Sequence, residues 1–99
     1  MKTTAVIIDD EEGARESLAN ILTSYVPDVE ILGKAASASE GYKLINEVKP
    51  QLIFLDVEMP NENAFDLIDK FDSVDFEIIF VTAYDHYAIQ AIKLYFIIL

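Results

Sequence analysis

Aspartates follow two of the apolar runs in this chain. Asp9 and Asp10 come directly after residues 5–8, and Asp56 comes directly after residues 52–55. Three carboxylates that lie close together repel one another unless a cation shares their site. A hard divalent ion such as Mg²⁺ takes oxygen ligands and keeps several waters for an incoming phosphate. We therefore expect a magnesium site wherever the fold brings these aspartates together.

A carboxylate in such a site can also do covalent chemistry, because it can attack a phosphoryl donor and form an acyl phosphate. Among the three aspartates, Asp56 has the strongest case for a functional role. The next helical pattern begins only at Ala64, so Asp56 does not serve as a helix start, and a carboxylate at the tip of a buried strand is costly unless it is paired or metal-bound. Thr82 follows another apolar run, residues 78–81, and its hydroxyl can donate a hydrogen bond to a phosphoryl oxygen.

The three apolar runs are short and rich in β-branched or aromatic residues, which predicts strands buried on both faces. Residues 29–32 alternate apolar and acidic side chains, which predicts a half-exposed edge strand. Helical periodicity separates these strands. The expected helices are residues 14–25, ended by Pro27; a segment that starts with a capping box of Ser37 and Glu40 and stops at Pro50; residues 64–71, with Asn63 as N-cap; and residues from about 85 to 95.

Alternating strands and helices predict an α/β fold, a flavodoxin-like doubly wound parallel sheet with strand order 2-1-3-4-(5). Ligands in such sheets bind beyond the carboxyl ends of the strands, where the strand order reverses. If strands one and three are neighbours, Asp9, Asp10 and Asp56 converge in one shallow acidic pocket. Glu11 and Glu12 need no such role, since acidic residues are favoured at the start of the helix that follows.

The composition excludes several classes of protein. The 99 residues include 18 acids and 7 bases, a net charge of -11, so we expect no nucleic-acid binding by this chain. The chain has no cysteine, which excludes a disulfide framework and a thiol nucleophile and suits a reducing cytosol. Hydrophobic residues make up 53% of the chain, yet no run is long enough to span a membrane. We expect a cytoplasmic domain with no membrane partner.

Three motifs together resemble the receiver domain of two-component response regulators, the CheY-like phosphoacceptor module. They are VIIDDE at 6–11, LIFLDVEMP at 52–60 and IFVTAYD at 79–85. The resemblance extends from residue 4 to about residue 93. TAYDHYA at 82–88 is similar to the LytTR-type (LytR/AlgR) subclass, whose full-length members carry a LytTR DNA-binding domain after the receiver and regulate transcription.

This resemblance implies a role for each matching residue. Asp56 would be the phosphoacceptor, phosphorylated by a partner histidine kinase. Asp10 and Asp56 would ligate Mg²⁺ directly, Asp9 would act largely through water, and the backbone carbonyl of Glu58 would complete the protein ligands.

The resemblance also implies which residues respond to phosphorylation and which set the rate of dephosphorylation. Thr82 would move toward the phosphoryl group on activation, and Glu58 and Tyr84 would tune how fast water removes the phosphate. The domain would be a phosphoprotein with self-phosphorylation and dephosphorylation chemistry only, not an enzyme with a turnover substrate. His86, a lone histidine near a helix start, is expected to be a surface residue.

Two departures from the family pattern lead to further expectations. Ala64 stands where the family usually has Gly, so we expect an altered or strained backbone there. The pattern also continues into a fifth strand with a Lys and Pro and then a fifth helix, whereas this chain closes with the apolar residues 94–99. We therefore expect residues 1–99 to form a receiver domain that is incomplete at its C-terminal end, with an altered fifth strand, no fifth helix and no output domain.

The apolar tail allows two arrangements. It can join the fourth helix in a homodimer or domain-swapped assembly, supplying or covering the position of the fifth strand, or it can fold back as the fifth strand of its own sheet.

Two other functions are compatible with the residues. One is an Mg²⁺-dependent phosphohydrolase, because haloacid-dehalogenase phosphatases and Toprim domains also place acids after a buried strand. The sequence Asp56-Val57-Glu58 departs from the Asp-x-Asp pattern of those phosphatases. The other is a truncated interaction or dimerisation domain that works without phosphorylation.

Overall fold

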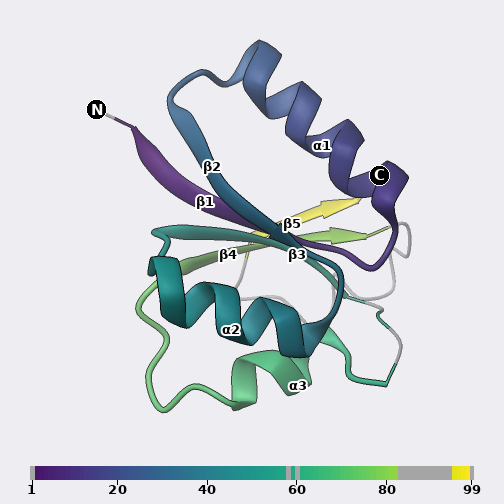
Figure 1. Cartoon of the computed structure of the whole chain (residues 1–99), viewed down its shortest axis with the longest axis vertical. Coiled ribbons are helices and arrows are strands. Elements are labelled where there is room, and N and C mark those ends of the chain that lie inside the picture. Colours follow the sequence, from purple (N-terminus) through teal and green to yellow (C-terminus); the bar gives the residue numbers. More distant parts are fainter. Residues whose placement is uncertain (1, 58, 60, 83–94, 99) are drawn as a thin grey trace.

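The computed structural model describes residues 2–57, 59, 61–82 and 95–98 of the chain (Figure 1). Strands and helices alternate along the described part of the chain as far as the fourth strand. The elements are β1 (Thr3–Ile8), α1 (Glu12–Tyr25), β2 (Val29–Ala35), α2 (Ala38–Val48), β3 (Leu52–Asp56), α3 (Ala64–Asp69), β4 (Glu77–Thr82) and β5 (Tyr95–Ile98).

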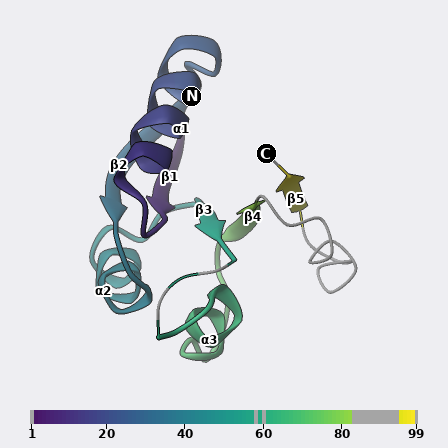
Figure 2. The same cartoon turned by 90° about the vertical axis from the view of Figure 1, so that its right-hand side faces the viewer.

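The strands form one parallel sheet in the order β2-β1-β3-β4-β5, which confirms the predicted order. Helix α1 lies over one face of this sheet, and α2 and α3 lie over the other (Figures 1 and 2). The strand order reverses at β1, because the chain passes from β1 to β2 on one side and from β2 over to β3 on the other. The gap between the carboxyl ends of β1 and β3 is therefore the place where such a fold binds a ligand.

The central strands are buried on both faces, as their unbroken apolar runs predict. Val6 and Ile8 of β1 belong to the core cluster on the side of α2 and α3, while Ala5 and Ile7 pack on the side of α1. Side chains in a strand point alternately to opposite faces, so a strand between two helical layers must be apolar at every position. Strand β2 instead alternates half-buried and exposed residues at the edge of the sheet, which confirms the predicted edge strand.

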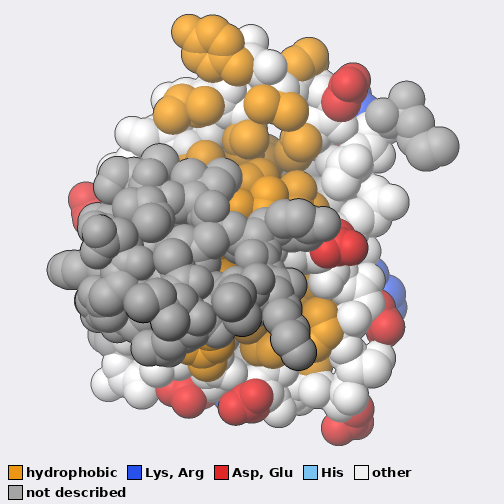
Figure 3. Space-filling model, turned by 180° about the vertical axis from the view of Figure 1, so that it is seen from behind, with side chains coloured by type: hydrophobic (Ala, Val, Ile, Leu, Met, Phe, Trp, Pro, Cys, Tyr) orange, Lys and Arg blue, Asp and Glu red, His pale blue; other side chains and the backbone are white. Residues whose placement is uncertain are grey.

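Helix α1 buries only part of its predicted apolar stripe. Leu22 is 7% exposed and Leu18 is half-buried, but Ile21 is 52% exposed and Tyr25 is 80% exposed. Helix α1 packs on β1 and β2, so the stripe is buried only where it faces those two strands. Hydrophobic side chains accordingly gather on the back of the molecule (Figure 3). Within the described ranges, no helix is long and apolar enough to cross a membrane.

The predicted helix caps are present, one of them in a different form. Ser37 Oγ accepts a hydrogen bond from the Glu40 amide at 3.2 Å, but the Glu40 carboxylate accepts from the Ala36 amide at 3.3 Å, one residue before the position expected in a capping box. Asn63 caps α3 as predicted: its Oδ1 accepts from the amides of the first turn, and Asp66 accepts from the Asn63 amide at 3.1 Å.

The backbone strain predicted at Ala64 is not found. Ala64 is fully buried as the first residue of α3, and its amide donates to the carbonyl of Val57 at 3.1 Å. The left-handed conformation falls on Asn61 instead, with φ 71°, and in another part of the described chain on Lys49, with φ 47°. Asn adopts this conformation more easily than most residues, so the turn before α3 does not need a glycine at position 64.

The prediction that Tyr95 ends a fourth helix was wrong. Tyr95 is the first residue of β5 and pairs with Ile79 of β4, and the ladder continues to Thr82 and Ile98. Aromatic and β-branched residues fill Tyr95–Ile98, and these favour a strand when a parallel neighbour is available. The apolar tail thus takes the second predicted arrangement, in which it adds a fifth strand to its own sheet. The rest of the predicted fourth helix lies outside the described residues.

Candidate metal centre

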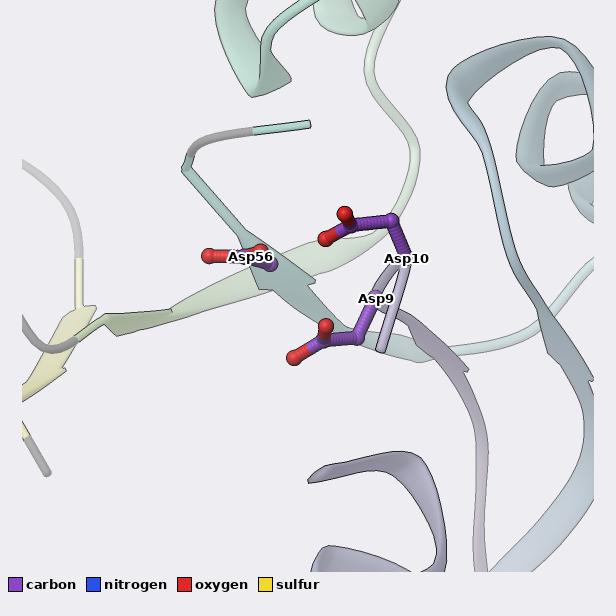
Figure 4. A group of neighbouring side chains, drawn as sticks. All are labelled: Asp9, Asp10 and Asp56. Carbon is purple, nitrogen blue, oxygen red and sulfur yellow. The ribbon is translucent and has the colours of Figure 1, made fainter. Parts of the chain in front are cut away.

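The three predicted aspartates come together at the carboxyl edge of the sheet. Asp9 and Asp10 follow β1, and Asp56 is the last residue of β3, the strand beside β1. Each contributes a carboxylate oxygen to a group whose members all lie within 4.8 Å of one another. Figure 4 shows the three side chains pointing to the same side of the strand ends. The convergence expected from the strand order is confirmed.

Burial and nearby negative charge make the ionised carboxylate of Asp9 unfavourable. Desolvation by burial raises the pKa of Asp9, and the negative charges of Asp10 and Glu11 raise it further. A hydrogen bond from the Glu11 amide and the positive charge of Arg15 act in the opposite direction, but the net direction is upward. The anionic form of Asp9 is therefore destabilised in the folded chain, and a bound cation would relieve that cost.

The donor set fits a hard divalent ion. Asp9 and Asp56 are half-buried and Asp10 is exposed, so the group is open to solvent on one side. Mg²⁺ in proteins takes carboxylate oxygens together with several waters, and an open side leaves positions for those waters and for a substrate phosphate. Asp9, Asp10 and Asp56 are therefore the residues that could hold Mg²⁺ at this edge of the sheet.

Asp9 is held by three hydrogen bonds, one to β2, one within the loop and one to α1. Its amide donates to the carbonyl of Ala35 at 3.0 Å. Its Oδ1 accepts from the amide of Glu11 at 2.9 Å, and its backbone carbonyl accepts from Arg15 Nη1 at 2.8 Å. The position of this carboxylate is therefore set by the backbone around it and by one side chain of α1.

Arg15 was not identified from the sequence. A signal was present: Arg15 is the one basic residue between Lys2 and Lys34, and it lies near the start of α1, where the helix dipole disfavours a positive charge. A cation at such a position is favoured by a nearby acceptor, and the backbone carbonyl of Asp9 is that acceptor here.

The other predicted site residues are placed only in part. Val81 pairs with Asp56 across β3 and β4, and Thr82 is the next and last residue of β4. The backbone of Thr82 thus lies at the same edge of the sheet as the aspartates. Glu58, Tyr84 and His86 lie outside the described residues.

Comparisons with known proteins agree with the fold. The family model described as "Response regulator receiver domain" matches residues 5–96. An "Uncharacterized response regulatory protein" of Vibrio cholerae serotype O1 is 44% identical over 91 residues, which are 91% of this chain and 38% of that protein. The "Transcriptional regulatory protein BtsR" of Escherichia coli K12 is 36% identical over 89 residues, which are 89% of this chain and 37% of that protein. The chain therefore spans less than two fifths of these relatives.

Solved structures show the same arrangement of strands and helices. The response regulator domain of Thermotoga maritima CheB superposes with a TM-score of 0.83 at 28% identity, over 99% of this chain and 78% of that one. A LuxR-family DNA-binding response regulator from Staphylococcus aureus superposes with a TM-score of 0.85 at 22% identity, over 97% and 85%. The match of the family model over nearly the whole chain shows that the chain belongs to the response regulator receiver domain family.

Proposed function

We propose that this chain is the phosphoacceptor domain of a two-component phosphorelay and that Asp56 accepts a phosphoryl group from a histidine kinase. The observation that carries the proposal is the approach of Asp9, Asp10 and Asp56 within 4.8 Å at the carboxyl edge of a doubly wound sheet. A group of carboxylates at that position is suited to a divalent ion and, with the ion, to an incoming phosphoryl group.

In the proposed reaction a carboxylate oxygen of Asp56 attacks the phosphorus of the kinase phosphohistidine. The new O–P bond forms as the N–P bond breaks, and the imidazole, protonated on its other ring nitrogen, leaves as the neutral group on the kinase. Mg²⁺, when bound, neutralises the charge on the phosphoryl oxygens. Asp10 and Asp56 would ligate it directly, Asp9 through water, and Glu58 through its backbone carbonyl.

Two further residues would act on the phosphorylated state. The hydroxyl of Thr82 donates to a phosphoryl oxygen and changes position when the group is present. Glu58 and Tyr84 control the access of water to the acyl phosphate and so set the lifetime of the signal. The domain turns over no free substrate, so we propose a signalling protein and not an enzyme.

The output is proposed to be transcription, in the cytoplasm, through a LytTR DNA-binding domain that is not among the 99 residues of this chain. Two observations support this proposal. The motif at 82–88 is similar to that subclass, and one relative at 36% identity carries the name of a transcriptional regulator. In this proposal the chain itself is a receiver domain over residues 1–99 and contacts no nucleic acid.

The test is incubation with Mg²⁺ and either acetyl phosphate or beryllofluoride, followed by intact-mass and NMR measurements. With acetyl phosphate the expected result is one phosphoryl adduct on the wild-type chain and none on Asp56→Asn; with beryllofluoride it is a change in the NMR spectrum of the wild type that Asp56→Asn does not show. Asp72→Asn, which changes an exposed aspartate of the loop after α3, is the matched control and should be phosphorylated like the wild type. Absence of an adduct despite metal binding would favour an interaction domain that works without phosphorylation, and turnover of a free phosphoester would favour a phosphohydrolase.

We also propose that copies of the chain associate. The sequence suggested a contact through the fourth helix and the apolar tail; the helix lies outside the described residues, and Tyr95–Ile98 pairs with β4 of the same chain. In the described sheet β5 is an edge strand, and Ile21, Tyr25 and Val26 are exposed apolar residues on or next to α1. Light scattering across a concentration series tests this proposal: a mass of one chain at the highest concentration would contradict it.

A further inference from the structure

Arg15 reaches from the first turns of α1 to the backbone of the acidic loop. Its Nη1 donates to the carbonyl oxygen of Asp9 at 2.8 Å in a partly buried hydrogen bond. Its own amide donates to the carbonyl of Glu11 at 3.1 Å, as part of the helix. The side chain and the backbone of Arg15 therefore hold the two ends of the loop from Asp9 to Glu11.

This contact completes the immobilisation of Asp9. The Asp9 amide is held by the carbonyl of Ala35, and Oδ1 is held by the amide of Glu11. Without Arg15 the Asp9 carbonyl would lose this hydrogen bond, and a residue in a loop is held less precisely than one in a strand. A hydrogen bond from a charged donor is stronger than one between neutral groups, so Arg15 is a suitable clamp for a peptide group.

Arg15 also has an opposite effect on a cation site. A guanidinium beside the carboxylates repels a divalent ion, and salt screens that repulsion. Holding a ligand in place does not depend on screening in the same way. The two effects thus differ in sign and in salt dependence, and a measurement of metal affinity can separate them.

We propose that Arg15 is a positioning residue for the metal centre: through the Asp9 peptide it holds the carboxylates of Asp9 and Asp10 toward Asp56, and this effect outweighs its charge repulsion. The inference rests on the proposed function, since it concerns Mg²⁺ at these three aspartates. Arg15 touches neither substrate nor reacting atoms, so it is not a catalytic residue.

The experiment is a calorimetric Mg²⁺ titration of the full chain at low and high salt. Arg15→Gln is expected to weaken Mg²⁺ binding by about tenfold, as loss of a supporting contact does at metal sites. Arg15→Lys keeps the charge and one donor, so we expect a smaller loss of roughly threefold. The ratio of wild-type to Arg15→Gln affinity should rise when salt is raised, because salt screens the charge repulsion by Arg15 and leaves its positioning effect.

Lys34→Gln is the matched control. This substitution also removes one positive charge. Lys34 forms an ion pair at 2.8 Å with Glu16, the residue after Arg15 in α1, and not with Asp9. Its Mg²⁺ affinity should equal that of the wild type or exceed it slightly at low salt. Wild-type or tighter binding by Arg15→Gln, or a difference that disappears at high salt, overturns the proposal.

A second readout needs no metal. The Glu11 amide donates to Asp9 Oδ1, so its hydrogen exchange should be faster in Arg15→Gln and unchanged in Lys34→Gln. If Arg15→Gln does not fold, Arg15→Lys decides: weaker binding than the wild type supports positioning, and equal binding overturns it. If the wild type itself binds no Mg²⁺, the proposed function fails, and the exchange of the Glu11 amide alone decides whether Arg15 orders the loop.

Discussion

Ile8 pairs in register with Leu55 across β1 and β3, so the residues that follow them, Asp9 and Asp56, lie side by side at the sheet edge. A shift of one residue in this register would separate the two carboxylates and turn one strand's side chains to the opposite faces. The burial of both strands on both faces keeps the register in place, because each apolar side chain has a specific position in one of the two cores. The core thereby positions the acidic site.

Asp9→Asn should stabilise the metal-free chain at neutral pH. The folded chain raises the pKa of Asp9 above 3.8, so between 3.8 and the raised value the folded state binds more protons than the unfolded state, and stability falls as pH rises through that window. Asn is neutral, and its Oδ1 can still accept from the Glu11 amide. We expect Tm to rise by roughly 1–3 °C at pH 7, with solvent screening taken into account.

The measurement is thermal unfolding followed by circular dichroism from pH 3 to pH 7. The stabilisation should vanish below the unfolded pKa, where both chains are neutral at this position. A variant that is less stable than the wild type at pH 7 without metal would contradict the assigned electrostatic cost.

Mg²⁺ should stabilise the folded chain through the same carboxylates. A ligand that binds only the folded state adds about 2.7 kcal/mol at a concentration of 100 times its Kd. Asp10→Asn and Asp56→Asn should lose most of this gain, while Asp72→Asn, remote from the cluster, should keep it. Thermal scans with Mg²⁺ and then with EDTA measure the effect, and an equal shift in all three variants would indicate nonspecific binding.

Phe80→Ala should be among the most destabilising substitutions in the described core. Phe80 is 0% exposed, and its ring centroid lies 5.3 Å from that of Phe65. Removing a buried aromatic ring leaves a cavity and costs about 3–5 kcal/mol. Urea unfolding measures the loss, with Val74→Ala, at a residue that is 44% exposed, expected within about 0.5 kcal/mol of the wild type. A loss under about 1 kcal/mol at Phe80 would mean that the core repacks.

Lys49→Gly should increase stability. Lys49 is the C-cap of α2 with φ 47°, a left-handed conformation that costs a residue with a Cβ roughly 1 kcal/mol and that Gly adopts freely. The expected gain in the free energy of unfolding is about 0.5–1 kcal/mol. Lys43→Gly is the control, because Lys43 is an exposed residue inside the same helix, and Gly there should cost about 1 kcal/mol. Destabilisation by both variants would contradict the strain at Lys49.

Much of the fold and of the site could be predicted from sequence because the signals are local. A strand covered on both faces must be apolar throughout, so the apolar runs predict strands at residues 5–8, 52–55 and 78–81. Asn63, as an N-cap residue, predicts the start of α3. The aspartates stand at the carboxyl ends of these strands, and the topology of doubly wound sheets brings such ends together. These features depend on which residues are adjacent in the sequence and on a general rule of sheet topology.

Other features depend on which surfaces meet in space. The exposure of Ile21 and Tyr25 reflects how much of the sheet α1 covers, and the strand at Tyr95 requires the free edge of β4. The hydrogen bond from Arg15 to Asp9 requires that the first turns of α1 lie close to the end of β1. The sequence by itself determined the elements from β1 to β4 and the acidic residues of this receiver domain, because those follow from local patterning. Only the tertiary structure decided which side chain steadies the acidic residues, because a contact between a helix and a loop depends on distances that no local pattern encodes.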